Sequence, residues 1–429
     1  MVSPLIVRSG ISSVAAMAVA ALLPSQAIAS SDHDPLWYFN DFDYAAIHAS
    51  GVTGEGVTIA VIDGPIHPDI DTLAGADVRV QESTCLTSAG TPQPGVSSNA
   101  TLAGHGTQVV SLLVGTGADA EGALGVKGVA PGATVLTYAV YLPADGECFH
   151  PGQDGADLGL ENAIAAAIED ALDNGADIIS VSLGAKQSEA LVAAMTRTMR
   201  EGKILVAALS NDTSSDLGVE GYPGAGNGVV SVLSADRSGT LALGEGTGQP
   251  NTSPYVVVVA PGVDILAQVG DGQWQRSTVS GTSYATPIVA GNLALVLDKY
   301  PGATGNQAVQ SLVHNTGIGP HELSWDAEYG YGLVVPATLL AANPSVYPDA
   351  NLLIDDPRTE TGAFRVPLGS EIFPDGEPTT EPSATGDAHQ VNDPVGPNLT
   401  GVLLLGLAAL VVLAVIITVT VVISRKRNT

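Results

Sequence analysis

The chain has 429 residues, 45% of them apolar, and its 44 acidic side chains outnumber 15 basic ones to give a formal net charge of −29. A surface this acidic repels phosphate groups, which excludes nucleic acids as partners and excludes electrostatic binding to anionic lipid headgroups. The globular part, about 310 residues, has a suitable length for a single large α/β enzyme domain.

The amino-terminal residues predict a secretory signal peptide. Arg8 precedes an apolar stretch over residues 11–23, and the small-residue sequence Ala27-Ile28-Ala29 follows. A positive charge, an apolar core and a small-residue cleavage site occur in this order in such peptides, so we expect cleavage before Ser30. An uncleaved anchor is the alternative, although the apolar core is short for a membrane span.

Two candidate catalytic residues lie in the first third of the remaining chain. Residues 58–62 form a short β-rich apolar run that ends at Asp63, which places this carboxylate at the carboxyl edge of a buried strand, where α/β sheets bind ligands. His105 lies between Gly104 and Gly106, so its ring can face a cleft without crowding by neighbouring side chains. The structural alternatives are a turn-forming aspartate and an exposed or structural histidine.

Cys85 and Cys148 are the only cysteines of the chain. In the oxidising exterior that a signal peptide implies, two cysteines can pair, and we expect a disulfide between them. Closing so long a loop would stabilise the fold by about 4 kcal/mol in the chain-entropy model. Two buried thiols are the alternative.

The most informative motif surrounds Ser283. Small residues crowd this serine, with Gly281 before it and Pro287 after it, and the apolar run 288–297 follows. The motif predicts a helix that starts near Ser283, where unpaired N–H groups and the positive end of the helix dipole favour an oxyanion. Pro287 would remove the N–H that normally bonds the Ser283 carbonyl, which a helix tolerates in its first turn. By itself such a segment is more typical of a helix cap or a turn.

The carboxyl-terminal part predicts a membrane anchor. Residues 345–398 are rich in proline and acidic side chains, which favours an extended stalk; residues 363–368 could instead add a binding strand. Residues 399–423 are uncharged and apolar, and as a helix they would span roughly 37 Å at about 1.5 Å per residue. The tail at 424–429 is basic, so the positive-inside rule places it in the cytoplasm and the domain outside the cell membrane.

With Asp63, His105 and Ser283 in this order, the chain resembles the subtilisin-like serine proteases, or subtilases. The resemblance implies an α/β fold with a mainly parallel central sheet flanked by helices on both faces. It also implies endopeptidase activity through an Asp-His-Ser triad and an acyl-enzyme. The further roles that it implies are Asn211 as an oxyanion-hole donor and a substrate-binding strand end at Ser182, Leu183 and Gly184.

The chain departs from the usual family pattern at two places. Asp63 is followed by Gly64-Pro65, where most relatives have a small hydroxyl residue and then glycine, and Ser210 replaces a glycine before Asn211. The first change removes a hydroxyl partner of Asp63, and the second can shift the oxyanion loop. Neither change removes a catalytic group.

The order of segments resembles the mycosins, which are membrane-anchored subtilases of type VII secretion systems. This resemblance implies a peptide or protein substrate and a secretion membrane complex as partner. Two alternatives are a structural scaffold whose catalysis is dispensable and a transpeptidase or macrocyclase. No residue cluster has the spacing of a catalytic metal site; the family often binds structural calcium, which the sequence neither shows nor excludes. The predicted segments are 1–29 signal peptide, 30–50 extension, 51–344 peptidase domain, 345–398 stalk, 399–423 transmembrane helix and 424–429 cytoplasmic tail.

Overall fold

The computed structural model describes residues 34–87, 89–119, 125–142, 148–150, 159–212, 221–269, 274–319, 321–354 and 366–374. The chain divides into two compact units, residues 1–380 and 381–429, and every described residue belongs to the first unit.

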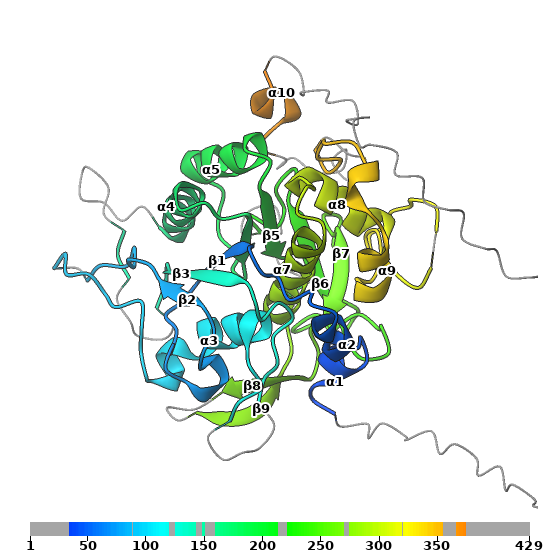
Figure 1. Cartoon of the computed structure of the whole chain (residues 1–429). Coiled ribbons are helices and arrows are strands. Elements are labelled where there is room, and N and C mark those ends of the chain that lie inside the picture. Colours follow the sequence, from blue (N-terminus) through cyan, green and yellow to red (C-terminus); the bar gives the residue numbers. More distant parts are fainter. Residues whose placement is uncertain are drawn as a thin grey trace, which may run out of the picture. The chain divides into compact units, whose positions relative to one another are not determined.

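A seven-stranded parallel sheet forms the centre of this unit, and a separate antiparallel hairpin lies beside it (Figure 1). The strands are β1 (Thr58–Asp63), β2 (Val78–Val80), β3 (Thr134–Ala139), β4 (Ile178–Val181), β5 (Ile204–Ala208), β6 (Val230–Ala235), β7 (Val258–Pro261), β8 (Ile265–Val269) and β9 (Gln275–Val279). The sheet order is β2-β3-β1-β4-β5-β6-β7, and β8 pairs with β9. The chain therefore leaves β1 toward one edge of the sheet and returns to the other side of β1 at β4.

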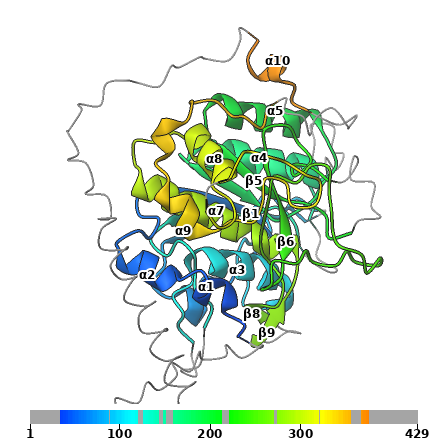
Figure 2. The same ribbon diagram turned by 90° about the vertical axis from the view of Figure 1, so that its right-hand side faces the viewer.

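Helices cover both faces of the sheet (Figures 1 and 2). The helices are α1 (Trp37–Asn40), α2 (Tyr44–Ala49), α3 (Ala100–Val114), α4 (Leu160–Asp173), α5 (Glu189–Arg200), α7 (Thr282–Lys299), α8 (Gly305–His314), α9 (Pro336–Ala341) and α10 (Gly369–Ile372), with 3-10 turns η1 (Asp71–Leu73) and η2 (Pro344–Val346).

The alternation of side chains along β1 explains why both faces need cover. Ile59 and Val61 pack into one core with α3 and α7, whereas Ala60 and Ile62 pack into a second core with α4 and α5. Successive side chains of a strand point to opposite faces, so a continuous apolar run must be buried on both. The predicted α/β fold with a mainly parallel sheet is confirmed.

The amino-terminal extension packs into the first core. The indole N–H of Trp37 donates to the Val263 carbonyl at 3.0 Å, and the Tyr38 hydroxyl donates to the Lys127 carbonyl at 2.6 Å. On α2, the buried Tyr44 hydroxyl accepts a 2.7 Å hydrogen bond from the Asn292 amide of α7. The extension thus fastens to the central helix α7.

The structure corrects the predicted start of the stalk at residue 345. Leu353 and Ile372 are fully buried, each in one of the two large cores. The Asn351 amide donates to the Gly228 carbonyl at 2.9 Å, and Arg200 of α5 donates to the Ile372 carbonyl at 2.6 Å. Described residues as far as 374 therefore belong to the folded unit, because a few apolar side chains among the prolines pack into its cores.

Within the described residues, no helix is both long enough and apolar enough to cross a membrane. The predicted signal peptide, the predicted transmembrane segment at 399–423 and the basic tail lie outside the described residues.

Candidate active site

Three of the predicted site residues follow neighbouring strands at the carboxyl edge of the sheet. Asp63 is the last residue of β1, Ser182 follows β4, and Asn211 lies three residues beyond β5. These strands are adjacent in the order β1-β4-β5. Strands that follow β1 in the chain are added on one side of it as far as β3 and on its other side from β4 onward. In α/β proteins, ligands bind in the crevice at the carboxyl edge of the sheet where the strand order changes in this way.

Asp63 and His105 form a directly hydrogen-bonded pair. The Nδ1 atom of His105 lies 2.8 Å from Asp63 Oδ1, which also accepts the Gly64 N–H at 2.7 Å. The aspartate side chain is 1% exposed and the histidine side chain is 28% exposed. Burial lowers the pKa of His105, but the negative charge and the hydrogen bond of Asp63 outweigh burial and raise that pKa above its ordinary value. The imidazole is therefore held in one orientation with Nε2 directed away from the aspartate.

The missing hydroxyl after Asp63 has a visible consequence. None of the described residues donates a hydrogen bond to the buried Oδ2 atom of Asp63. A Cβ atom at Gly64 would lie 3.2 Å from the ring of Tyr141, so this tyrosine occupies the space that a larger residue would need. Burial, followed by the charge of Asp63, raises the pKa of Tyr141. The ring of Tyr141 thus lies against Gly64, close enough to Asp63 for the carboxylate charge to raise the pKa of its hydroxyl.

Gly106 brings His105 close to Asp63. A Cβ atom at Gly106 would lie 2.7 Å from the Pro65 carbonyl oxygen and 2.8 Å from that of Gly64, so α3 contacts this loop backbone to backbone. A Cβ atom at Gly104 would meet only the Gln108 side chain, at an ordinary 3.8 Å. The sequence predicted that both glycines relieve crowding of the histidine ring, but Gly106 instead permits the approach of the helix.

We expect Gly106→Ala to lower the unfolding free energy by about 1–3 kcal/mol because the added carbon forces α3 away from the loop. It should also lower kcat/KM, since His105 moves away from Asp63. The matched variant Gly104→Ala should be stable or gain up to about 1 kcal/mol, because alanine favours a helix. Chemical denaturation and peptide hydrolysis measure both effects. Equal behaviour of the two variants would contradict the assigned contact.

Ser283 is the second residue of α7, which starts after Gly281. Pro287 lies inside the helix and cannot donate to the Ser283 carbonyl; the Ser182 hydroxyl donates to that carbonyl instead, at 2.9 Å. The hydroxyl of Ser283 in turn donates to the Ser182 carbonyl at 3.2 Å. In this structure the Ser283 hydroxyl is therefore bonded to the end of β4 and not to His105. Ser182 has a positioning contact that sequence reasoning did not predict.

Tyr284 links the Asp63–His105 pair to the helix that carries Ser283. Its ring centroid lies 5.8 Å from that of His105, so the imidazole packs against the residue that follows Ser283. Burial, followed by the charge of Asp63, raises the pKa of Tyr284 to about 12 and keeps its hydroxyl neutral. Sequence reasoning missed both Tyr284 and Tyr141, although an aromatic residue beside a candidate nucleophile is a usable signal.

Asn211 faces Ser283 across a cavity of about 200 Å³. Its Oδ1 accepts hydrogen bonds from the Thr282 backbone N–H at 2.9 Å and from the Thr282 hydroxyl at 3.1 Å. These bonds fix the amide so that its Nδ2 donor remains for a ligand. The cavity is lined by Ser182, Leu183, Gly184, Ala208, Leu209, Ser210, Asn211, Gly221, Thr282 and Ser283.

The serine before Asn211 does not displace the loop from the cavity. The Asn251 amide donates to the Ser210 carbonyl at 2.8 Å, and the Ser210 hydroxyl accepts the Asp212 N–H at 3.1 Å. Ser210 thus stabilises the turn through its side chain.

We expect Asn211→Ala to lower kcat by about a hundredfold to a thousandfold with little change in KM, because an oxyanion donor acts mainly in the transition state. Steady-state hydrolysis of a peptide substrate measures the effect. Asn174→Ala, at the carboxyl end of α4, is the matched control and should remain fully active. A variant that changes only KM would exclude the oxyanion role.

Cys85 and Cys148 lie outside this cavity and are joined by a disulfide with a Cα–Cα distance of 4.6 Å. The bond links the loop after β2 to the segment after β3. Among the described residues, the only group of three closely spaced potential metal ligands contains these two cysteines and His150.

A parallel α/β sheet with an Asp–His pair beside a serine at a helix start is the arrangement of a serine hydrolase. The sequence model of the Subtilase family matches residues 54–332. Subtilisin E of Bacillus subtilis (strain 168) is 32% identical over 323 residues, which cover 72% of this chain and 74% of that protein. The thermostable alkaline protease of Halalkalibacterium halodurans is 33% identical over 302 residues, covering 70% and 71%.

Among solved structures, fervidolysin from Fervidobacterium pennivorans, a keratinolytic enzyme related to subtilisin, matches with a TM-score of 0.53 and 26% identity. The match covers 68% of this chain and 44% of fervidolysin. The chain belongs to the subtilase family and is a subtilisin-like serine protease.

Proposed function

We propose that the protein is a membrane-anchored, extracytoplasmic endopeptidase that hydrolyses peptide bonds through an acyl-enzyme. The observation that carries the catalytic part of the proposal is the 2.8 Å Asp63–His105 bond. His105 also packs against Tyr284, the residue that follows Ser283, and Ser283 lines the same cavity as Asn211.

Each group has one task in this mechanism. The Ser283 hydroxyl turns from the Ser182 carbonyl to Nε2 of His105, which takes its proton as Ser283 attacks the substrate carbonyl. Asp63 keeps the proton on Nδ1 and stabilises the imidazolium. The Asn211 amide and the Ser283 N–H receive the oxyanion, and water then releases the acyl group.

The substrate would lie along the strand end at Ser182, Leu183 and Gly184, which lines the same cavity. The carbonyl of Ser182 already accepts a hydrogen bond from Ser283, so a substrate N–H that bonded to this carbonyl would displace the Ser283 hydroxyl from it. We therefore expect substrate binding to favour the rotated hydroxyl.

Labelling of the full-length protein with a fluorophosphonate tests the proposal. Wild type should be labelled, whereas Ser283→Ala and His105→Ala should not. A folded wild type that resists labelling would contradict an assembled triad and favour the scaffold alternative. Mass spectrometry of peptide products separates hydrolysis from transpeptidation, because ligated or cyclic products require an amine in place of water.

The anchor and the mycosin-like role rest on the sequence outside the described residues. The apolar span at 399–423 and the basic tail after it support a single crossing with the protease domain outside the cell. Protease digestion of intact cells should remove the domain and spare a tag on the tail. In a strain that lacks the gene, a Ser283→Ala copy that restores secretion would assign the essential role to the fold rather than to catalysis.

A further inference from the structure

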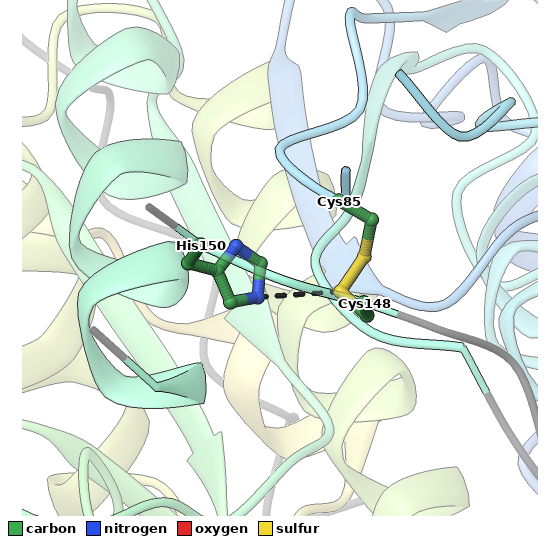
Figure 3. Close-up of side chains that lie close together, drawn as sticks. All are labelled: Cys85, Cys148 and His150. Carbon is green, nitrogen blue, oxygen red and sulfur yellow. Dashed lines mark hydrogen bonds between the residues drawn. A yellow bond between two sulfur atoms is a disulfide. The ribbon is translucent and has the colours of Figure 1, made fainter. Parts of the chain in front are cut away.

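A second cluster of reactive side chains lies where the segment after β3 meets the loop after β2. Cys85 and Cys148 form the disulfide, and the ring of His150 points a nitrogen at the Cys148 sulfur (Figure 3). The ligand atoms of the three residues all lie within 4.8 Å of one another. Cys85 is fully buried and His150 is 8% exposed, whereas Cys148 is partly exposed. Cys148 is therefore the most exposed of the three residues.

Backbone hydrogen bonds hold the cluster in place without help from the sulfur–sulfur bond. Leu86 and Phe149 exchange two such bonds, of 3.1 Å and 2.8 Å, which pair the segments that carry the two cysteines. The Thr84 N–H donates to the Ala139 carbonyl at 3.2 Å, which joins the first segment to the end of β3. Opening the disulfide would thus leave both thiols near each other.

His150 is oriented in the manner of a metal ligand. Its Nδ1 lies 3.1 Å from the Thr84 carbonyl oxygen, and its Nε2 lies 3.2 Å from the Cys148 sulfur. A backbone carbonyl that accepts the Nδ1 proton leaves the Nε2 lone pair for a metal, and this is the usual outer partner of a coordinating histidine. Nε2 also lies 3.1 Å from the Val140 carbonyl oxygen, to which the other tautomer, with its proton on Nε2, would donate. Metal binding at Nε2 therefore requires the tautomer that is protonated on Nδ1 and bonded to the Thr84 carbonyl.

We propose that the reduced protein binds one zinc ion through Cys85, Cys148 and His150. A dithiol reductant supplies two electrons and two protons to the disulfide and is itself oxidised to a disulfide. The two thiols then lose their protons as Zn²⁺ binds, so that two thiolates and one neutral imidazole hold the ion. Two sulfurs and one nitrogen are a preferred zinc ligand set, and a water molecule would complete the tetrahedral coordination.

The test uses the full-length protein in both redox states. Thiol titration of the unreduced, denatured chain should find no free thiol. After phosphine reduction and anaerobic removal of the phosphine, zinc competition with a chromophoric chelator should give one ion per reduced chain and none per oxidised chain. Cobalt added to the reduced chain should give a thiolate charge-transfer band.

Two variants distinguish zinc binding at the three-residue site from zinc binding by the thiols alone. His150→Ala should weaken zinc binding by about a hundredfold or more, because it removes a ligand and keeps both thiols. His321→Ala, at an exposed histidine far along the chain, should bind zinc as wild type does. A reduced, folded chain that takes up no zinc would overturn the proposal, as would an affinity unchanged by His150→Ala. If reduction abolishes the near-ultraviolet circular dichroism, zinc must restore it, and failure to do so also overturns the proposal.

Discussion

Replacing Ser283 by alanine is expected to lower kcat by about a millionfold, because the acyl-enzyme route disappears while the rest of the cavity remains. Residual hydrolysis should still exceed the uncatalysed rate, since Asn211 and the helix start continue to bind the developing oxyanion. Active-site titration and progress curves with a peptide substrate measure both. The fold should be unaffected, because among the described residues the Ser283 hydroxyl has one long hydrogen bond, of 3.2 Å, to the Ser182 carbonyl.

Ser277→Ala is the matched control, because Ser277 is an exposed serine on β9 six residues before the nucleophile. It should keep full activity and full fluorophosphonate labelling. If Ser283→Ala retained more than about a hundredth of wild-type kcat, another residue would be the nucleophile, and the assignment of the triad would be wrong.

Asp63→Asn should lower kcat by about ten-thousandfold and also change the pH dependence. In the wild type, Asp63 raises the pKa of His105. Because the base must be neutral, kcat/KM should rise with pH through a value above the ordinary pKa of histidine. The variant lacks the charge, so burial alone acts and lowers that pKa. Its activity should therefore begin to rise at lower pH than that of the wild type.

The pH profile of kcat/KM distinguishes this role from a merely structural one. A packing defect would lower activity at every pH without moving the profile. Asp77→Asn is a suitable control, because that carboxylate pairs with Arg79 on the surface and should leave the profile unchanged. An unshifted acidic limb in Asp63→Asn would contradict electrostatic control of His105.

The sequence was sufficient to predict the fold class and the site candidates. Apolar runs such as 58–62 are the signal of strands buried on both faces, and in the observed sheet β1 is an interior strand between β3 and β4. Asp63, His105 and Ser283 have the residue types that nucleophilic catalysis requires, and their order along the chain resembles that of a known family. The helix start near Ser283 followed from glycine and proline, which act locally through the backbone.

The sequence did not predict which segments far apart in the chain pack against one another. Residues 345–374 read as part of a stalk because their composition is poor in large apolar groups, yet Leu353 and Ile372 are fully buried. A few buried side chains are enough to hold a segment on the folded domain. The average composition of the segment does not reveal them. The same limit applies to the amino-terminal extension, whose partners on α7 are more than two hundred residues away.

The sequence by itself therefore determined the strand that ends at Asp63, the helix start near Ser283 and the residue types of the triad, because these depend on short-range spacing. The parallel sheet and the roles of Asn211 and Ser182 were implied by the family resemblance. The tertiary structure decided how those groups meet. It placed the Ser182 hydroxyl within hydrogen-bond distance of the Ser283 carbonyl, which has no helical donor because of Pro287. It also fixed the orientation of the Asn211 amide through the hydrogen bond from the Thr282 N–H. It also let α3 approach the Asp63 loop through Gly106. Each of these contacts joins residues that only the folding of the chain brings within a few ångströms.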